Sequence, residues 1–129
     1  MPAGEPFSPR QRADLDRALK NAEQTSGLGF SLYVGDLQGG RDQAVAMQAT
    51  MANAERGVLV AVDPSRRALE IVTGNVAAHS LDQRACTLAG VTMTSAFAQG
   101  DLVGGLKRGI QLLGAHGRHE PIKHLDEPF

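Results

Sequence analysis

The sequence has few aromatic side chains, a single cysteine and no tryptophan. Phe and Tyr together make up 4% of the 129 residues, whereas the hydrophobic share is 42%. The core must therefore be built from Ala, Val, Leu, Ile and Met. Because Cys86 is alone, an internal disulfide and a zinc site made of several cysteines are excluded. Cys86 stands in a helix-like run, where a buried, inert thiol is a better interpretation than a nucleophile.

The chain also lacks a strong net charge and a long apolar run. Thirteen Lys and Arg residues against 14 Asp and Glu residues give a net charge of −1, so no overall field attracts nucleic acid or an anionic membrane. No stretch approaches the ~18 apolar residues that cross a bilayer. The first residues lack the basic start and apolar segment of a signal peptide. We therefore expect a cytoplasmic protein with no nucleic-acid partner and no membrane insertion.

The length of 129 residues corresponds to one domain. Residues 1–9 contain three prolines and little apolar material, which is typical of a loose arm. Residues 115–129 show no clear hydrophobic period, and Gly117 and Pro121 break any helix that might align the histidines there. We expect a flexible N-terminal arm over residues 1–9, one domain over residues 10–114, and an extended or mobile tail over residues 115–129.

Hydrophobic periodicity predicts helices over about residues 9–25, 44–56, 81–98 and 102–114, and strands over about residues 30–34, 58–62 and 68–73. A strand–helix–strand unit makes the first two strands parallel through a right-handed crossover. The short turn at residues 63–66 makes the third strand antiparallel to the second. The predicted fold is an α/β/α sandwich of three layers, with a small mixed sheet of three to four strands and helices on both faces.

The hexapeptide Gly-Asp-Leu-x-Gly-Gly occurs twice, at residues 35–40 and 100–105, each time before a helix-like stretch. A glycine turn with a helix-capping Asp can expose backbone N–H groups to a ligand. On this interpretation Gly35, Gly39 and Gly40 are ligand-binding candidates. The alternative is that both copies only begin helices.

Three acidic residues follow elements that this topology brings to one end of the sheet. Asp36 and Asp63 follow the two parallel strands, and the helix over 81–98 is long enough to return Asp101 to the same end. Carboxylates are ligands for Ca²⁺ or Mg²⁺, so Asp36, Asp63 and Asp101 are the metal candidates, with Asp82 as runner-up. Arg67 is the candidate for binding an anion. The alternative is that the three carboxylates are caps and turns that never meet.

Several segments resemble the TPM domain, a family named after thylakoid-lumen, photosystem II repair and receptor-modulator proteins. The resemblance lies in residues 57–63, 67–74, 81–82 and 93–102, and it is closest to a soluble actinobacterial branch of unknown function. It implies an α/β/α sandwich, divalent-cation binding in some members and acid phosphatase activity proposed for plant members. By position, Asp63, Asp82 and Asp101 match acidic residues that recur in the family's motifs.

The leading functional hypothesis is a non-enzymatic, TPM-like module that binds a divalent cation, a protein partner or both in the cytoplasm. It rests on the acidic end of the sheet and on the lack of a recognisable nucleophile-and-base pair. Without a P-loop or dinucleotide fingerprint, we expect no organic cofactor. One alternative is a metal-assisted, acid-phosphatase-like hydrolase in which Arg67 steadies the phosphate. Another is a scaffold that self-associates through apolar helix faces. The oligomeric state is not predicted.

Overall fold

A computed structural model describes residues 7–117, which form three strands, five α-helices and two short 3₁₀ helices. In chain order these are α1 (Pro9–Ser26), β1 (Gly29–Val34), α2 (Gly40–Gln48), η1 (Ala54–Arg56), β2 (Gly57–Asp63), η2 (Pro64–Arg66), β3 (Ala68–Thr73), α3 (Ala77–Ser80), α4 (Gln83–Ala98) and α5 (Leu102–Gly117). Most of the expected arm and tail lie outside the described residues. None of the described helices combines the length and apolar character that crossing a membrane requires.

The three strands pair in the order β1-β2-β3. β1 runs parallel to β2, with Phe30 opposite Val58, whereas β3 runs antiparallel to β2, with Leu69 opposite Val62. Every residue of β2 is buried, as expected for a central strand covered on both faces. The predicted mixed sheet is confirmed.

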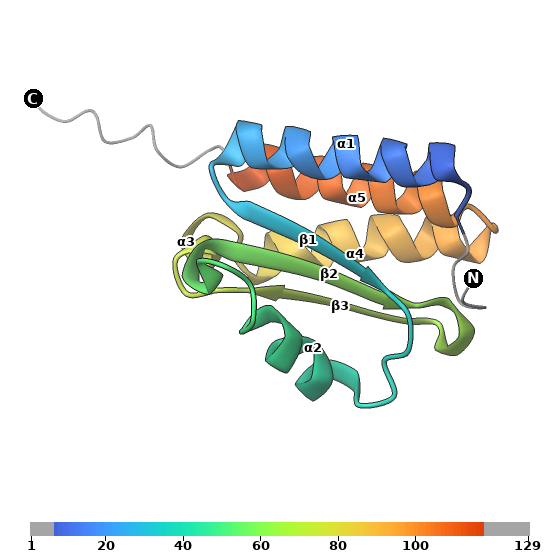
Figure 1. Cartoon of the computed structure of the whole chain (residues 1–129), viewed down its shortest axis with the longest axis horizontal. Coiled ribbons are helices and arrows are strands. Elements are labelled where there is room, and N and C mark those ends of the chain that lie inside the picture. The colour runs from blue at the N-terminus through green and yellow to red at the C-terminus, as the bar shows by residue number, and fades with distance from the viewer. Residues whose placement is uncertain (1–6, 118–129) are drawn as a thin grey trace, which may run out of the picture.

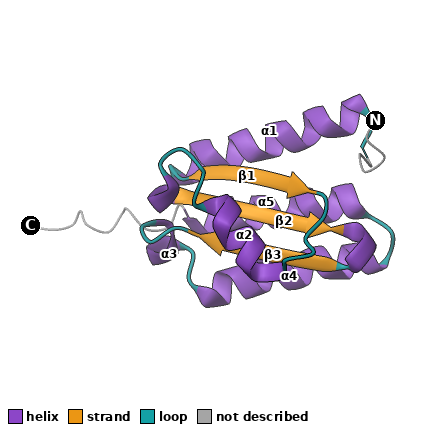
Figure 2. Cartoon of the chain, turned by 60° about the horizontal axis from the view of Figure 1, so that its bottom comes forward, coloured by secondary structure: helices purple, strands orange, loops and turns teal. Residues whose placement is uncertain are grey.

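Helices cover both faces of the sheet, as Figures 1 and 2 show. α2 packs on one face against β2 and β3, while α1 and α4 pack on the other face against β1 and β3. α5 packs against both α1 and α4. The predicted α/β sandwich with helices on both faces is therefore confirmed.

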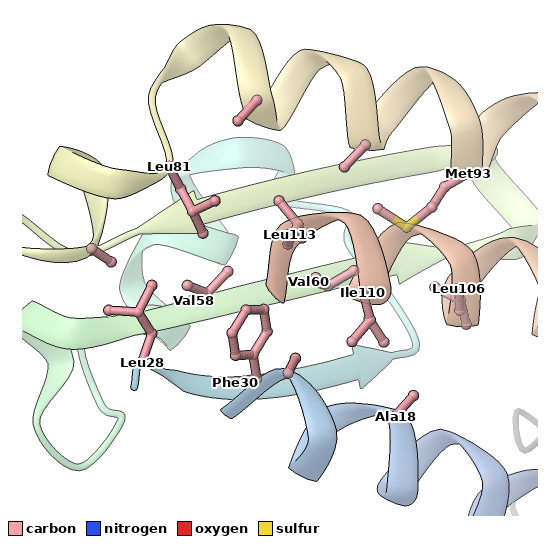
Figure 3. Close-up of a cluster of buried hydrophobic side chains, with 14 of the residues drawn as sticks. Ala18, Leu28, Phe30, Val58, Val60, Leu81, Met93, Leu106, Ile110 and Leu113 are labelled. Carbon is pink, nitrogen blue, oxygen red and sulfur yellow. The ribbon is translucent and has the colours of Figure 1, made fainter. Parts of the chain in front are cut away.

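Alternate side chains of β2 supply the two parts of the core. Val58, Val60 and Val62 face the α1, α4 and α5 side, where they join Ile110 and other aliphatic residues (Figure 3). Leu59 and Ala61 face α2. Each fully buried aliphatic side chain stabilises the fold by about 1.5–3 kcal/mol before the loss of chain entropy is subtracted.

The first helix begins and ends as its sequence predicts. The Ser8 hydroxyl accepts a hydrogen bond from the Gln11 N–H, and the Gln11 side chain accepts one from the Ser8 N–H. Pro9 occupies the first helical position, where its missing N–H costs nothing. Gly27 ends the helix with φ +79°, a conformation that suits glycine.

The other predicted helices have wrong bounds. The helix predicted over residues 44–56 is α2, which begins at Gly40 and ends at Gln48. The buried Gln48 side-chain amide donates to the carbonyl oxygens of Ala54 and Gly57, at 2.8 and 3.0 Å, so the chain after Gln48 follows a different path. The helix predicted over residues 102–114 is α5, which continues to Gly117.

The helix predicted over residues 81–98 is α4, which begins at Gln83 because the Asp82 carboxylate caps it. The short helix α3 lies before it and was not predicted.

Glycines allow α5 to lie close to its two neighbouring helices. A Cβ atom at Gly109 would overlap the Met93 side chain of α4, and one at Gly114 would lie 2.9 Å from the Ala22 Cα of α1. Met93 is fully buried, so it has little space to move aside. The packing of α5 against α4 and α1 therefore depends on glycine at positions 109 and 114.

We predict that Gly109→Ala lowers the free energy of unfolding by about 1–2 kcal/mol. Overpacking a core costs about 1–3 kcal/mol, and the better helix propensity of Ala returns up to about 1 kcal/mol. Urea unfolding followed by circular dichroism measures the change.

Gly90→Ala is the matched control within α4. A Cβ atom there meets nothing closer than a Leu69 methyl carbon at 4.0 Å. The substitution should therefore raise the free energy of unfolding by about 0.5–1 kcal/mol. Equal effects of the two substitutions would show that close helix contact at Gly109 is unimportant.

Candidate functional site

The carboxyl ends of the parallel strands β1 and β2 lie at one end of the sheet, which we call the sheet end. The β2–β3 turn and the α4–α5 turn lie there too (Figure 1). Consistent with this placement, both turns contribute residues to the lining of one hollow: Pro64 and Arg67 from the β2–β3 turn and Gly100 from the α4–α5 turn. Ligands bind at this end in many open α/β sheets.

Asp63 is a buried carboxylate that joins two loops at the sheet end. Only 3% of the residue is exposed. Its Oδ2 accepts a hydrogen bond from the Leu37 N–H at 2.9 Å, and its Oδ1 accepts from the Ser65 hydroxyl at 2.8 Å and the Ser65 N–H at 3.1 Å. The Arg66 Nε lies 3.3 Å from Oδ2. We call these four residues the Asp63 cluster.

The Asp63 cluster stabilises the charged form of the carboxylate. The Leu37 N–H contributes most to lowering the pKa of Asp63 below its ordinary value of 3.8, followed by the Ser65 hydroxyl, while burial acts in the opposite direction. Asp63 is therefore ionised at neutral pH and has both oxygens in use. Its role in this structure is to hold the loop after β1 against the β2–β3 turn.

Arg66 brings Asp36 and Asp63 together. Its Nε lies 3.6 Å from Asp36 Oδ1 as well as 3.3 Å from Asp63 Oδ2. Asp36 also accepts a hydrogen bond from the Gln38 N–H, at 3.0 Å. Sequence reasoning placed the two carboxylates correctly at one end, but it did not identify Arg66 as the cation between them. The position of Arg66 in the same short turn as Asp63 was the available signal.

Asp101 lies at the sheet end but does not join the other two carboxylates. It accepts a hydrogen bond from the Gly104 N–H at 2.9 Å, which caps α5, and it lies 3.5 Å from Arg108 Nη2. The loop containing Asp36 leads to α2 on one face of the sheet, whereas Asp101 begins α5 on the other face. Within residues 7–117, no three His, Cys, Asp or Glu side chains are grouped so that they could hold a metal ion. The expected group of three carboxylates is not formed.

Asp82, the runner-up metal candidate, lies at the start of α4. Its carboxylate accepts a hydrogen bond from the Ala85 N–H at 2.9 Å. α4 crosses the sheet between Asp82 and Asp101, so the two residues lie at opposite ends of the helix (Figure 1). Asp82 acts as a helix cap in this structure.

The glycines of the first hexapeptide use their own N–H groups within the fold. The Gly35 N–H donates to the Val62 carbonyl, the Gly40 N–H donates to the Leu37 carbonyl, and the Gly39 N–H donates to the Gln43 side chain. The distances are 3.0, 2.9 and 2.8 Å. These three candidates therefore offer no free N–H group to an anion in this conformation.

Arg67 lies beside an apolar hollow that sequence reasoning missed. The hollow has a volume of about 400 Å³, and its lining includes Leu69 of β3, Phe97 of α4 and Leu102 of α5. Within residues 7–117, Arg67 makes no ion pair, and its φ of +55° is unusual for a residue other than glycine. The predicted crossing of the sheet by α4 was the only signal for this hollow, since it brings Phe97 to the sheet end.

Cys86 lies on α4 beside the open edge of β3. Burial raises the pKa of the Cys86 thiol, and the charge of Asp82 adds to the effect. A raised pKa favours the uncharged thiol, which is the less reactive form. The sequence-based interpretation of Cys86 as an inert thiol agrees with this direction, although the side chain is only half-buried.

A comparison with protein families matches residues 1–114 to the profile described as "Domain of unknown function (DUF5130)". Among curated proteins, the chain is similar to two from Mycobacterium tuberculosis. These are "Uncharacterized protein Rv2468c" of strain H37Rv and "Uncharacterized protein MT2543" of strain CDC 1551. Each is 34% identical over 113 residues, covering 85% of this chain. The chain spans 66% of the length of these curated relatives.

Two solved structures share the fold. The NMR structure of the BA42 protein from Bizionia argentinensis has a TM-score of 0.74 at 16% identity, covering 91% of this chain and 85% of that chain. The solution NMR structure of the N-terminal domain of the cg2496 protein from Corynebacterium glutamicum has a TM-score of 0.70 at 15% identity, covering 92% and 78%. At these identities the likeness shows the fold alone.

We predict that Asp63→Asn destabilises the protein at neutral pH and weakens its acid sensitivity. Because the pKa of folded Asp63 is lowered, the stabilisation by this carboxylate is complete above 3.8 and is lost as the pH falls through the folded value. An Asn amide also places a donor among the donors of Leu37 and Ser65. Urea midpoints measured above and below pH 3.8 should differ less in the variant than in the wild type.

Asp16→Asn is the control, because Asp16 is exposed on α1. It should leave both midpoints close to those of the wild type. A midpoint for Asp63→Asn that lies below the wild type by the same amount at both pH values would show that the Asp63 charge does not stabilise the fold.

Proposed function

Because this chain belongs to the DUF5130 family, a domain of unknown function, we propose its function from the geometry of the sheet end: it is a non-enzymatic module that binds a protein partner. The observation that carries the proposal is the Asp63 cluster. It fixes two loops through a buried charge and leaves neither carboxylate oxygen free for chemistry. A rigid surface without a reactive group is suited to recognition.

Two side chains considered as possible nucleophiles, those of Ser65 and Cys86, are not activated. The Ser65 hydroxyl donates to Asp63, whose pKa is lowered, and such a carboxylate is a weak general base. The Cys86 thiol has a raised pKa, which is the opposite of what a cysteine nucleophile needs. Both observations support binding over catalysis.

The surface around the sheet end has the composition of a transient protein interface. Arg67 lines the apolar hollow, and the charged side chains of Asp36, Arg66 and Asp101 lie elsewhere at the same sheet end. Such interfaces commonly have an apolar centre and a polar rim. Opposite charges on a partner would orient it during association.

The resemblance to TPM domains fits this proposal. The sandwich fold is the one that the resemblance implies, and the three matching acidic residues have structural partners here. Asp63 joins two loops, while Asp82 and Asp101 cap α4 and α5. We propose a TPM-like cytoplasmic module in which these carboxylates order the binding surface.

A divalent cation is the second candidate ligand. Asp36 and Asp101 expose 65% and 54% of their side chains, so each has room for a hydrated ion. Arg66 and Arg108 lie within 3.6 and 3.5 Å of these carboxylates and would compete with it. Any such site is therefore weak, at the level of about 10⁻³ M or above.

Self-association is the remaining non-enzymatic alternative. Leu88 and Val91 expose 48% and 57% of their surface on α4, at positions three residues apart on the helix. Two such residues make a small patch compared with a stable dimer interface. Light scattering would reveal a dimer as a mass above the 13.6 kDa of one chain.

We predict that Thr94→Arg abolishes partner binding. Thr94 is an exposed residue of α4 that lines the hollow, so a long charged side chain there would block it. Binding is measured by quantitative capture from extracts of cells that express this chain, followed by direct titration with each purified candidate. Ser95→Arg is the matched control, because it adds the same charge on the same helix at an exposed residue outside the hollow. A partner retained by both variants, or lost from both, would contradict the proposed surface.

We also predict that neither metal-dependent alternative is strong. Purified protein should release no phosphate from a phosphomonoester with Mg²⁺, and Ca²⁺ or Mg²⁺ should shift amide resonances near Asp36 and Asp101 only at about 10⁻³ M or above. Phosphate release that requires metal and disappears in Asp63→Asn would overturn the non-enzymatic proposal. Asp36→Asn tests whether any cation-induced shifts come from that carboxylate.

A further inference from the structure

One side of the sheet carries a groove between the open edge of β3 and the helix α4, which we call the β3–α4 groove. The apolar hollow at the sheet end forms one end of it, and two further hollows continue from Leu69 past Ile71 to Thr73. Gly90 of α4 lies along this path, and a Cβ atom there would have no contact closer than 4.0 Å. The groove therefore follows the strand from Leu69 to Thr73, with Arg41 among its lining residues.

The strand bordering this groove has backbone groups that do not take part in the sheet. The Gly74 N–H donates to the Gly57 carbonyl, so the antiparallel register pairs the backbone of Val72, Glu70 and Ala68 with β2. The alternate residues Leu69, Ile71 and Thr73 direct their N–H and C=O groups to the open edge. The Ile71 carbonyl confirms this direction, because it accepts a 3.3 Å hydrogen bond from Arg41 of α2.

The opposite edge of the sheet, on β1, also borders a hollow. There the Phe30 N–H is taken by the Glu23 carboxylate of α1, at 2.9 Å. Phe7 lines the hollow between α1 and the later part of β1, together with Arg12 and Asp16. The β3 edge differs in the apolar lining of its hollow at the sheet end, beside Arg67.

Charge distinguishes the two ends of the β3–α4 groove. Arg41 is paired with Glu70 at 2.9 Å, and Asp82 is engaged as the cap of α4. Arg67, at the sheet end, has no ion pair with any residue between 7 and 117, and it borders the apolar hollow. The combination of a free guanidinium, an apolar hollow and an open strand edge suits the carboxyl terminus of a peptide.

We propose that the β3–α4 groove binds the carboxyl-terminal segment of a partner protein as a fourth strand, antiparallel to β3. The terminal carboxylate pairs with Arg67, and the apolar side chain of the last residue enters the hollow between Leu69 and Phe97. Backbone groups of the peptide bond to Leu69 and Ile71, where a peptide N–H replaces the long Arg41 bond to the Ile71 carbonyl. This inference rests on the proposed function, since it names the segment by which the partner binds.

The unusual conformation of Arg67 provides a variant that separates binding from folding. At φ +55° glycine is favoured over arginine, so Arg67→Gly removes the guanidinium and relieves backbone strain. We expect a thermal midpoint at or above that of the wild type, together with weaker peptide binding. Gly90→Leu is a second variant, because its side chain fills the groove while improving the helix propensity of α4.

The probe is a pool of synthetic peptides of random sequence that end in Leu, Val or Phe with a free carboxylate, compared with the same peptides amidated. Selected peptides should shift the amide resonances of Leu69, Ile71 and Gly90, and amidation should weaken their binding tenfold or more. Arg67→Gly should weaken the binding of the free-acid peptides by a similar factor and leave the binding of the amidated peptides unchanged. Arg84→Gln, an exposed charge change on α4, should bind like the wild type.

The inference is wrong if no peptide of the pool shifts these resonances, or if free and amidated peptides bind equally. It is also wrong if Gly90→Leu binds like the wild type. A partner that is lost in Thr94→Arg, while peptide termini fail to bind, would leave the proposed function standing and reject only this mode of binding. If the wild-type protein captures no partner and binds no peptide, both the proposed function and this mode of binding are rejected.

Discussion

The buried carboxylate of Asp63 is the interaction on which the sheet end depends. It connects the chain after β1 to the turn after β2 through hydrogen bonds with Leu37 and Ser65, and the ion pair between Arg66 and Asp36 adds a second link between these segments. A charge removed from water is tolerated only when its oxygens are well partnered, which they are here. The same bonds that stabilise the fold therefore occupy both oxygens of Asp63.

A second constraint comes from the glycines of α5. Gly109 makes room for the Met93 side chain of α4, and Gly114 lets α5 lie against the backbone of α1 at Ala22. The close layer places α4 alongside β3 without covering the edge of that strand. The groove and its apolar hollow are thus consequences of how the helices pack, and Arg67 gives the hollow a charge at the end where the strands finish.

The sandwich fold is shared with proteins whose sequences are only 15–16% identical, whereas the family relationship rests on closer sequence similarity. Shared architecture says little about activity, because function resides in particular side chains. In this chain, two of the acidic residues on which the TPM resemblance rests, Asp82 and Asp101, cap helices, and the third, Asp63, connects two loops. Arg67, which makes no ion pair within residues 7–117, and the edge of β3 carry the functional proposals.

Local sequence determined the order of the elements, the burial of β2 and the helix caps, because each depends on periodicity or on residues three positions apart. Asp101 caps a helix, as one of its two sequence interpretations predicted, whereas the cap at Asp82 was not predicted. The predicted end of α2 was wrong because it depends on a contact between residues farther apart in the chain. The buried Gln48 side chain donates to the Gly57 carbonyl, and α2 ends at Gln48. Only the tertiary structure decided that Arg66 lies between Asp36 and Asp63 while Asp101 caps α5 beside Arg108, so that the predicted group of three carboxylates does not form. Only it revealed the hollow beside Arg67, since three elements far apart in sequence must pack together to create that space.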